Sequence, residues 1–134
     1  MNIRGDNRGM AKSKNMILVI DNDKAFTSLV YKFLKDICKY EVKIVPDGYN
    51  GIIFAEKSTP ELILLDIRMP AMNGLGILEK LKSNEKTAHI PVIILTGFDD
   101  DDIKNRALSL KAADYLSKPI DLEVLRQRIA AALK

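Results

Sequence analysis

Four short apolar segments of the chain are each followed by a side chain that could take part in phosphoryl chemistry. Asp21 follows MILVI, Asp66 follows LILL, Thr96 follows PVIIL and Lys118 follows DYLS. A carboxylate can attack phosphorus and form an aspartyl phosphate. A hydroxyl and an ammonium can stabilise the charge on the phosphoryl oxygens. These residue types therefore indicate a phosphoacceptor site, provided that the fold brings the four side chains together.

The elements that would position these side chains alternate between strands and helices. Apolar runs predict strands, and apolar residues at helical spacing follow each of them. The strands are expected at 16–20, 40–45, 61–65, 91–95 and 114–117, and the helices within 26–37, 47–57, 75–81, 103–110 and 122–129. Such alternation implies a parallel sheet covered on both faces. We therefore expect an α/β domain, doubly wound, with five parallel strands and five helices, and for the strands we take the common doubly wound order 2-1-3-4-5.

This strand order would place the carboxyl ends of strands 1, 3, 4 and 5 side by side, where open parallel sheets bind their ligands. Strand 2 would lie outside the group, since its end at Pro46–Asp47 is typical of a turn and a helix cap. Clustered carboxylates raise one another's pKa unless a cation neutralises them. Their oxygens suit Mg²⁺. We thus expect Asp66 to be the nucleophile, helped by Thr96 and Lys118, with Gly97 leaving room for a phosphoryl donor.

Residues 15–134 resemble a response-regulator receiver domain of bacterial two-component signalling, a flavodoxin-like fold that chemotaxis receivers share. Four segments carry the resemblance, in the order and spacing of that family: ILVIDND, PELILLDIRMPAMNG, IPVIILTGFDD and AADYLSKPIDLEVL. The resemblance implies that Asp66 accepts a phosphoryl group from a histidine kinase or a histidine phosphotransfer protein. It also implies that Thr96 and Tyr115 form a switch pair, and that the peptide bond between Lys118 and Pro119 is cis.

The same resemblance implies a Mg²⁺ ion held by Asp21, Asn22, Asp66 and the backbone carbonyl of Arg68. Receivers usually have two adjacent acids after the first strand, and the second acid binds the metal directly. Here Asn22 takes the second position, and its amide oxygen can coordinate the ion without contributing charge. Asp23 usually points elsewhere in the family, and we expect it to cap the following helix. Weaker Mg²⁺ binding than in a two-acid receiver is therefore expected.

Composition and charge narrow the choice of function. The 134 residues suit one domain, and a single cysteine excludes an internal disulfide. The net charge of +3 resides in residues 1–14, which we expect to be a disordered basic tail, so the folded part has no basic surface for nucleic acid. Apolar runs are too short to span a bilayer, and no signal peptide is visible. We expect a cytoplasmic, stand-alone receiver over residues 15–134, without an output domain.

Without an output domain, a signal would leave through a protein-binding surface, for which we expect the fourth helix, the fifth strand and the fifth helix. Asp114 and Arg128 match part of the charged dimer face of DNA-binding relatives, with Lys104 nearby. Val124 replaces an acid expected on that face, so we expect a monomer or a weak dimer. The partners would be a kinase or phosphotransfer protein and a downstream protein target, and neither nucleic acid nor a membrane.

Two other functions stay open on the sequence alone. Asn22 motivates an interaction module that has the receiver fold and works without phosphorylation. ILVIDND also comes close to the first motif of haloacid dehalogenase-like phosphatases, with Asp21 as nucleophile and Asp23 as acid. Against that enzyme, Ala25 replaces the usual Thr or Val, and a late acidic motif is missing. The phosphoacceptor switch, which is not an enzyme, accounts for more of the motifs.

Three further features have simple structural interpretations. The acidic run at 99–102 is expected to be the solvated start of a helix, His89 a surface residue far from the site, and Cys38 a small apolar filler at the end of the first helix.

Overall fold

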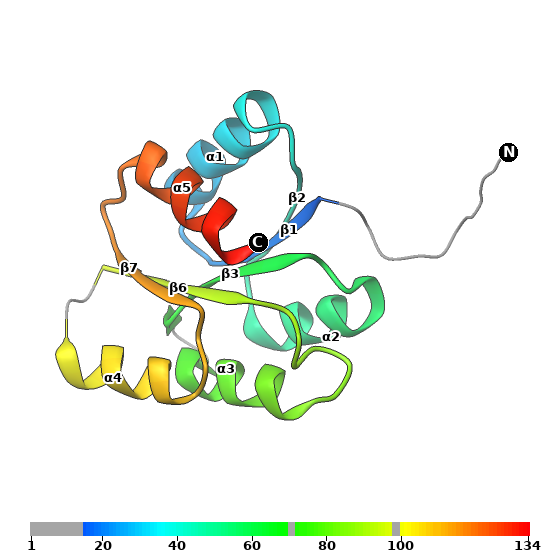
Figure 1. Ribbon diagram of the computed structural model, residues 1–134, viewed down its shortest axis with the longest axis vertical. Helices are drawn as coiled ribbons and strands as arrows, with labels where there is room; N and C mark the ends of the chain where they lie inside the picture. Colours follow the sequence, from blue (N-terminus) through cyan, green and yellow to red (C-terminus); the bar gives the residue numbers. More distant parts are fainter. Residues whose placement is uncertain (1–14, 70–71, 98–99) are drawn as a thin grey trace, which may run out of the picture.

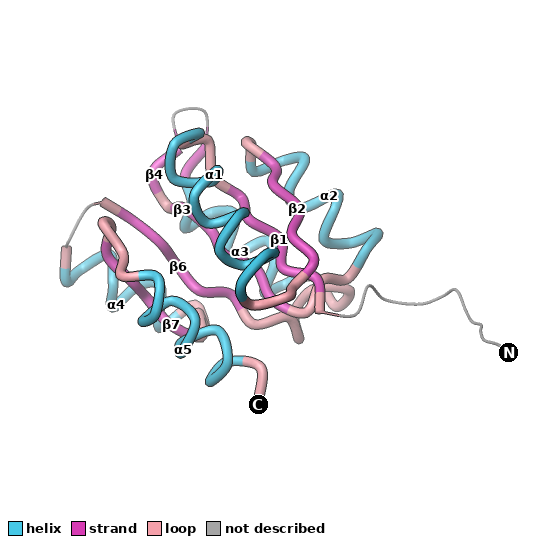
Figure 2. The backbone as a smooth tube through the Cα atoms, turned by 90° about the horizontal axis from the view of Figure 1, so that it is seen from above, coloured by secondary structure: helices cyan, strands magenta, loops and turns pink. Residues whose placement is uncertain are grey.

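A computed structural model describes residues 15–69, 72–97 and 100–134. Five parallel strands form one sheet in the order β2-β1-β3-β6-β7, which confirms the predicted strand order. Figure 2 shows the strands side by side in this order. They are β1 (Met16–Ile20), β2 (Glu41–Val45), β3 (Leu62–Asp66), β6 (Val92–Thr96) and β7 (Asp114–Ser117).

The helices cover both faces of the sheet. They are α1 (Lys24–Lys32), α2 (Gly48–Ser58), α3 (Gly74–Ser83), α4 (Asp101–Ser109) and α5 (Leu122–Ala132). Helices α1 and α5 lie on one face, and α2, α3 and α4 lie on the other (Figure 1). The expected doubly wound α/β fold is therefore confirmed. Within the described part of the chain, no helix is both long and apolar enough to cross a membrane.

Alternate residues of each central strand belong to two separate apolar cores. Leu18 and Ile20 pack toward α2, α3 and α4, whereas Ile17 and Val19 pack toward α1 and α5. Successive strand side chains point to opposite faces, so a strand covered on both faces must be apolar throughout. Every residue of β3 and of β6 is accordingly buried. Polar side chains that serve a site must then lie where these strands end.

Each of the five α-helices starts at an acidic or amide side chain that accepts hydrogen bonds from the first free backbone N–H groups. These N-caps are Asp23, Asp47, Asn73, Asp100 and Asp121. The caps confirm the interpretation of Asp47 and of the described part of the acidic run at 99–102; Asp99 lies outside the described residues. They also explain why so many strands of this chain are followed by an aspartate.

Two local features go beyond the sequence prediction. Helix α1 continues as a five-residue π-helix, η1 (Phe33–Ile37), and the N–H of Cys38 donates to the carbonyl of Phe33 at 3.1 Å. Two-residue strands β4 (Arg68–Met69) and β5 (Met72–Asn73) form a small antiparallel pair before α3. This pair anchors both ends of the loop that follows β3.

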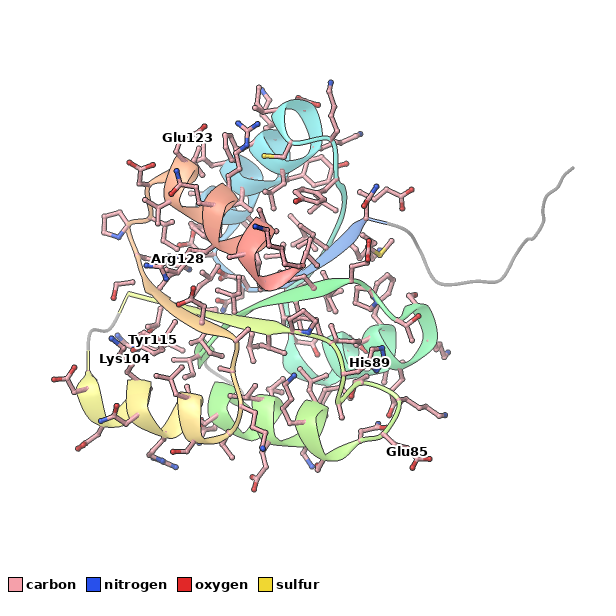
Figure 3. All side chains as sticks on the ribbon, in the orientation of Figure 1. Glu85, His89, Lys104, Tyr115, Glu123 and Arg128 are labelled. Carbon is pink, nitrogen blue, oxygen red and sulfur yellow. The ribbon has the colours of Figure 1, made fainter. Side chains whose placement is uncertain are left out.

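The expectations for Cys38 and His89 are confirmed. Cys38 is half-buried and packs against the core on the α1 and α5 face. His89 is exposed and lies at the edge where the strands begin, far from Tyr115 (Figure 3). The expected tail at 1–14 lies outside the described residues.

Gly74 permits the closest backbone approach beside this loop, and its replacement is the first prediction. A Cβ there would collide with Cα of Ile67 and lie 2.6 Å from its carbonyl oxygen. We expect Gly74→Ala to lower the free energy of unfolding by about 1–3 kcal/mol because backbone must move. Gly76→Ala is the matched control in the same helix, where a Cβ meets nothing within 4 Å. It should stabilise by about 0.5–1 kcal/mol.

Urea unfolding of the three proteins measures both effects. A Gly74→Ala variant as stable as the Gly76→Ala variant would show that the approach of α3 to Ile67 is not a constraint.

Candidate functional site

The strand ends bring an ammonium and three carboxylates together. The Nζ atom of Lys118, after β7, lies 2.8 Å from Oδ2 of Asp21 and 3.5 Å from Oδ2 of Asp66. Asp21 is 1% exposed to solvent and Asp66 is 6% exposed, so both residues are shielded from bulk water. Thr96 at the end of β6 is fully buried. The fold thus gathers the residues at the carboxyl ends of β1, β3, β6 and β7, as the strand order predicts.

Backbone hydrogen bonds hold these side chains in place. Oδ1 of Asp21 accepts from the N–H of Asp23 at 2.9 Å, and Oδ1 of Asp66 accepts from the N–H of Arg68 at 3.0 Å. Each carboxylate therefore keeps its second oxygen for Lys118. The N–H of Lys118 donates to the carbonyl of Thr96 at 2.6 Å, which ties the end of β7 to the end of β6. The peptide bond between Lys118 and Pro119 is cis, as the resemblance implied.

Asp23 lies nearer to the site than expected. Its Oδ1 caps α1 by accepting from the N–H of Phe26, which confirms the capping role. Its Oδ2, however, lies 3.8 Å from Nζ of Lys118. The expectation that Asp23 points elsewhere is therefore wrong for one of its two oxygens. The side chain remains about half exposed, so its charge is more strongly screened than the charge of Asp21.

Burial dominates the electrostatics of this cluster. It raises the pKa of Asp21, and the negative charge of Asp66 adds to the increase. The hydrogen bonds from Lys118 and from the N–H of Asp23 act in the opposite direction without cancelling it. With its three carboxylates ionised, the cluster carries more negative charge than one ammonium can neutralise. A further cation near Asp21 and Asp66 would be attracted.

The donor set fits a small divalent cation such as Mg²⁺. That ion is commonly held by one or two carboxylates together with water, and Asp21 and Asp66 supply two. Asn22 and Arg68 are exposed beside them and would offer an amide oxygen and a carbonyl oxygen. No three His, Cys, Asp or Glu side chains of the described residues form a metal-binding group. Two buried carboxylates and neutral oxygens are thus the donors that the described residues offer, and coordination by Asn22 stays a prediction.

Gly97, which follows Thr96, has open surroundings in the described part of the structure. A Cβ placed at Gly97 meets no atom of the described residues within 4 Å, and the use of this space by a phosphoryl donor stays a prediction.

Tyr115 lies on β7 within the core that faces α4, and only 8% of it is exposed. It pairs with Ile94 in the register that places Ser117 opposite Thr96. The Tyr115 ring is therefore already buried in this structure. Arg128 of α5 donates to both oxygens of Asp114 at 2.8 and 2.7 Å, and Val124 is 37% exposed. Figure 3 shows Lys104, Tyr115 and Arg128 around the same strand.

Phe26 also belongs to the site, although its helical spacing in the sequence indicated only a residue on the apolar face of the first helix. The Lys118 ammonium lies 4.2 Å from the centre of the Phe26 ring. Helical spacing places Phe26 three residues after the cap Asp23, in the first turn of α1 and next to the end of β1, but it does not indicate the contact with Lys118.

The comparisons with known proteins agree with this geometry. A model of the response regulator receiver domain matches residues 17–130. The chain belongs to this family. Receiver domains are signalling modules rather than classical enzymes, and they interact with histidine kinases or phosphotransfer proteins and with downstream targets. The family match covers most of the chain, and it is to a family other than the haloacid dehalogenase-like phosphatases.

Named relatives of this receiver include longer regulators. The DNA-binding dual master transcriptional regulator RpaA of Synechocystis is 36% identical over 118 residues, which are 88% of this chain and 48% of RpaA. The chain thus spans about half the length of the curated relatives it matches, such as RpaA and CiaR.

Solved receivers have the same fold. The BeF3-activated N-terminal receiver domain of RstA from Klebsiella pneumoniae is 26% identical, with a TM-score of 0.82 and coverage of 90% of this chain and 99% of that one. The Mn²⁺-bound form of response regulator Rcp1 is 29% identical, with a TM-score of 0.74 and coverage of 87% of this chain and 90% of that one. Receiver domains generally bind a divalent metal at the phosphorylation site.

The raised pKa of Asp21 generates the second prediction. A raised folded-state pKa makes the ionised carboxylate costly to fold above that pKa, and the cost vanishes below the unfolded value. We expect Asp21→Asn to raise the Tm of the metal-free receiver at neutral pH. The difference from the wild type should shrink as the pH falls through the raised pKa. Thermal unfolding over a pH series without divalent cations measures it.

Asp23→Asn is the matched control, because that carboxylate is half exposed and asparagine caps helices as well as aspartate does. Its Tm should stay near that of the wild type. A lower Tm for Asp21→Asn at neutral pH would show that the hydrogen bond from Lys118 outweighs the cost of burying the carboxylate.

Proposed function

We propose that this receiver is a phosphoacceptor switch in which Asp66 takes a phosphoryl group from a histidine kinase or a histidine phosphotransfer protein. The convergence of Lys118 on Asp21 and Asp66, at 2.8 and 3.5 Å, is the observation that carries the proposal. Asp66 is the better nucleophile of the two carboxylates. The side chain of Asp21 is fully buried and bonded to Lys118, whereas the side chain of Asp66 is 8% exposed at the end of β3.

The transfer would proceed by attack of a carboxylate oxygen of Asp66 on the phosphorus of a phosphohistidine. The phosphorus–nitrogen bond breaks, and the imidazole nitrogen keeps the electron pair and takes up a proton. Lys118 balances the charge on the phosphoryl oxygens, and Thr96 donates a hydrogen bond to one of them. Bound Mg²⁺, held by Asp21, Asp66, Asn22 and the carbonyl of Arg68, would supply the remaining positive charge.

Thr96 and Tyr115 would form the switch, because they would respond to the charge of the phosphoryl group on Asp66. Because Tyr115 is already buried against the α4 side of the sheet, phosphorylation would increase the time that the ring spends in this position rather than create a new one. The surface of α4, β7 and α5 would carry the change to a downstream protein. We also propose that this receiver acts as a stand-alone regulator, and that it does so as a monomer or a weak dimer.

A phosphorylation-independent interaction module is the second candidate, and Asn22 is the residue that favours it. The two functions differ in one measurable property, which is whether Asp66 accepts a phosphoryl group when Mg²⁺ is present.

The third prediction is that Asp66 is the single phosphorylation site. Incubation with acetyl phosphate and Mg²⁺ should add the mass of one phosphoryl group to the wild type and to Asp23→Asn, but none to Asp66→Asn. The reason is that Asp21 is hydrogen-bonded to the ammonium and Asp23 caps α1, whereas Asp66 holds its Oδ2 3.5 Å from the ammonium at the end of β3. Intact-mass spectrometry measures the label. Label on Asp66→Asn, or label mapped to Asp21, would contradict the assignment. An unlabelled wild type would favour the phosphorylation-independent module.

The fourth prediction concerns Asn22. Restoring a carboxylate there adds negative charge for the cation, so Asn22→Asp should tighten Mg²⁺ binding by on the order of 1 kcal/mol, about fivefold. It should also lower the stability of the metal-free protein, since it adds repulsion with Asp21. Amide shifts during Mg²⁺ titration measure the affinity, and thermal unfolding measures the stability.

Equal affinity in the two proteins would mean that Asp23, whose Oδ2 already lies 3.8 Å from Lys118, provides the charge that Asn22 lacks. Asn22→Ser is the control, because it removes the amide without adding charge and should not tighten binding.

A further inference from the structure

The Lys118 ammonium has fewer hydrogen-bonding partners than its crowded surroundings suggest. Of the three carboxylates near it, only Asp21 lies within hydrogen-bond distance, at 2.8 Å. Asp66 at 3.5 Å and Asp23 at 3.8 Å attract it by charge. An ammonium has three N–H donors. A single hydrogen bond to Asp21 therefore leaves two N–H donors of the ammonium without a carboxylate partner at hydrogen-bond distance, and other attractions contribute to its position.

The Phe26 ring lies against the same ammonium, 4.2 Å from ring centre to Nζ. The face of an aromatic ring carries partial negative charge and attracts a cation within about 6 Å, most strongly where water is excluded. Only 14% of the Lys118 side chain is exposed. Ring and ammonium therefore meet in a place where this attraction is not strongly screened.

The ring is held in place independently of Lys118. The N–H of Phe26 donates to the cap Asp23 at 3.1 Å, which fixes the residue in the first turn of α1. The ring is partly buried and packs against the core between the sheet, α1 and α5. The contacts that hold the ring are therefore separate from the contacts that hold the lysine.

We propose that Phe26 is a positioning residue for phosphoryl acceptance, which holds the Lys118 ammonium beside Asp66 through the face of its ring. This inference rests on the proposed function. A ring face attracts the charge without accepting an N–H bond, so Lys118 can turn its donors from Asp21 toward a phosphoryl group on Asp66 while Nζ stays in place. A carboxylate in the same position would compete with the phosphoryl oxygens for those donors.

Graded fluorination of Phe26 tests the ring face with little change in shape. Site-specific incorporation of 4-fluoro-, 3,5-difluoro- and 3,4,5-trifluorophenylalanine withdraws negative charge from the face in steps. The initial rate of phosphorylation by acetyl phosphate with Mg²⁺ should fall stepwise, by about threefold to tenfold over the series. Phe26→Leu should be as slow as the trifluoro protein, and Phe26→Tyr, which keeps the ring face, should recover most of the rate.

Phe54 provides a matched control within the chain. It is a partly buried phenylalanine of α2 whose ring lies 5.6 Å from the ammonium of Lys43. The same fluorinated series at Phe54 should leave the rate unchanged, because Lys43 is not near Asp66. A fall at both positions would show a general effect of fluorination and would overturn the proposal.

A spectroscopic measurement tests the contact without any phosphorylation. With ¹³C-labelled lysine, the ε-CH₂ protons of Lys118 should be shifted upfield by the ring current of Phe26, and the shift should disappear in Phe26→Leu. An unshifted signal in the wild type would overturn the contact, whatever the rates.

The outcomes separate this inference from the proposed function. A wild-type receiver that takes no label contradicts the phosphoacceptor function and removes the role of Phe26 with it. A wild type that is labelled, together with equal rates over the fluorinated series, overturns only the role of Phe26. Slow labelling in Phe26→Leu without a graded response to fluorine would show that the ring acts through packing alone, and would also overturn it.

Discussion

Burial of the sheet on both faces is the constraint on which the rest of this molecule depends. Strands β3 and β6 are buried throughout, and a charged side chain within them would have to be desolvated among apolar neighbours without a partner. In these two buried strands the chain therefore places charge only at the carboxyl end, where Asp66 lies. The parallel arrangement brings the carboxyl ends of the strands to one edge, so residues separated by 97 positions, such as Asp21 and Lys118, become hydrogen-bonded neighbours.

The aspartates at this edge of the sheet form two groups, one that caps helices and one that pairs with Lys118. Asp47, Asp100 and Asp121 satisfy the N–H groups at helix starts and face water. Asp21 and Asp66 cap no helix, and their buried oxygens are left for Lys118. Asp23 belongs to both groups, with one oxygen on the helix and the other toward the ammonium. Exposure and hydrogen bonding, rather than the presence of an acid after a strand, distinguish the two groups.

Much of this organisation could be predicted from the sequence, because it follows from patterns of neighbouring residues. Continuous apolar runs indicate buried parallel strands, and the polar residues at their ends indicate the site. The contact of Phe26 with Lys118 could not be predicted in the same way, since an apolar residue at helical spacing looks the same whether it packs on a leucine or on an ammonium. The π-helix at 33–37 and the strand pair β4–β5 depend on local backbone geometry that no residue type requires. The direction of Asp23 was mistaken because two oxygens of one carboxylate can serve different partners.

The division of the interior into two cores has a mechanical consequence. The side chains of α1 and α5 mesh with one set of strand residues, and those of α3 and α4 mesh with the alternate set. A layer of hydrogen-bonded backbone separates the two sets and deforms little, so a displacement in one core is poorly transmitted to the other. The strand ends are the exception: Phe26 reaches Lys118 from one layer, and the loop after Asp66 touches Gly74 of the other. A local change at the carboxyl ends of the strands can thus displace side chains in both cores, whereas a change elsewhere in the sheet acts mainly on one of them.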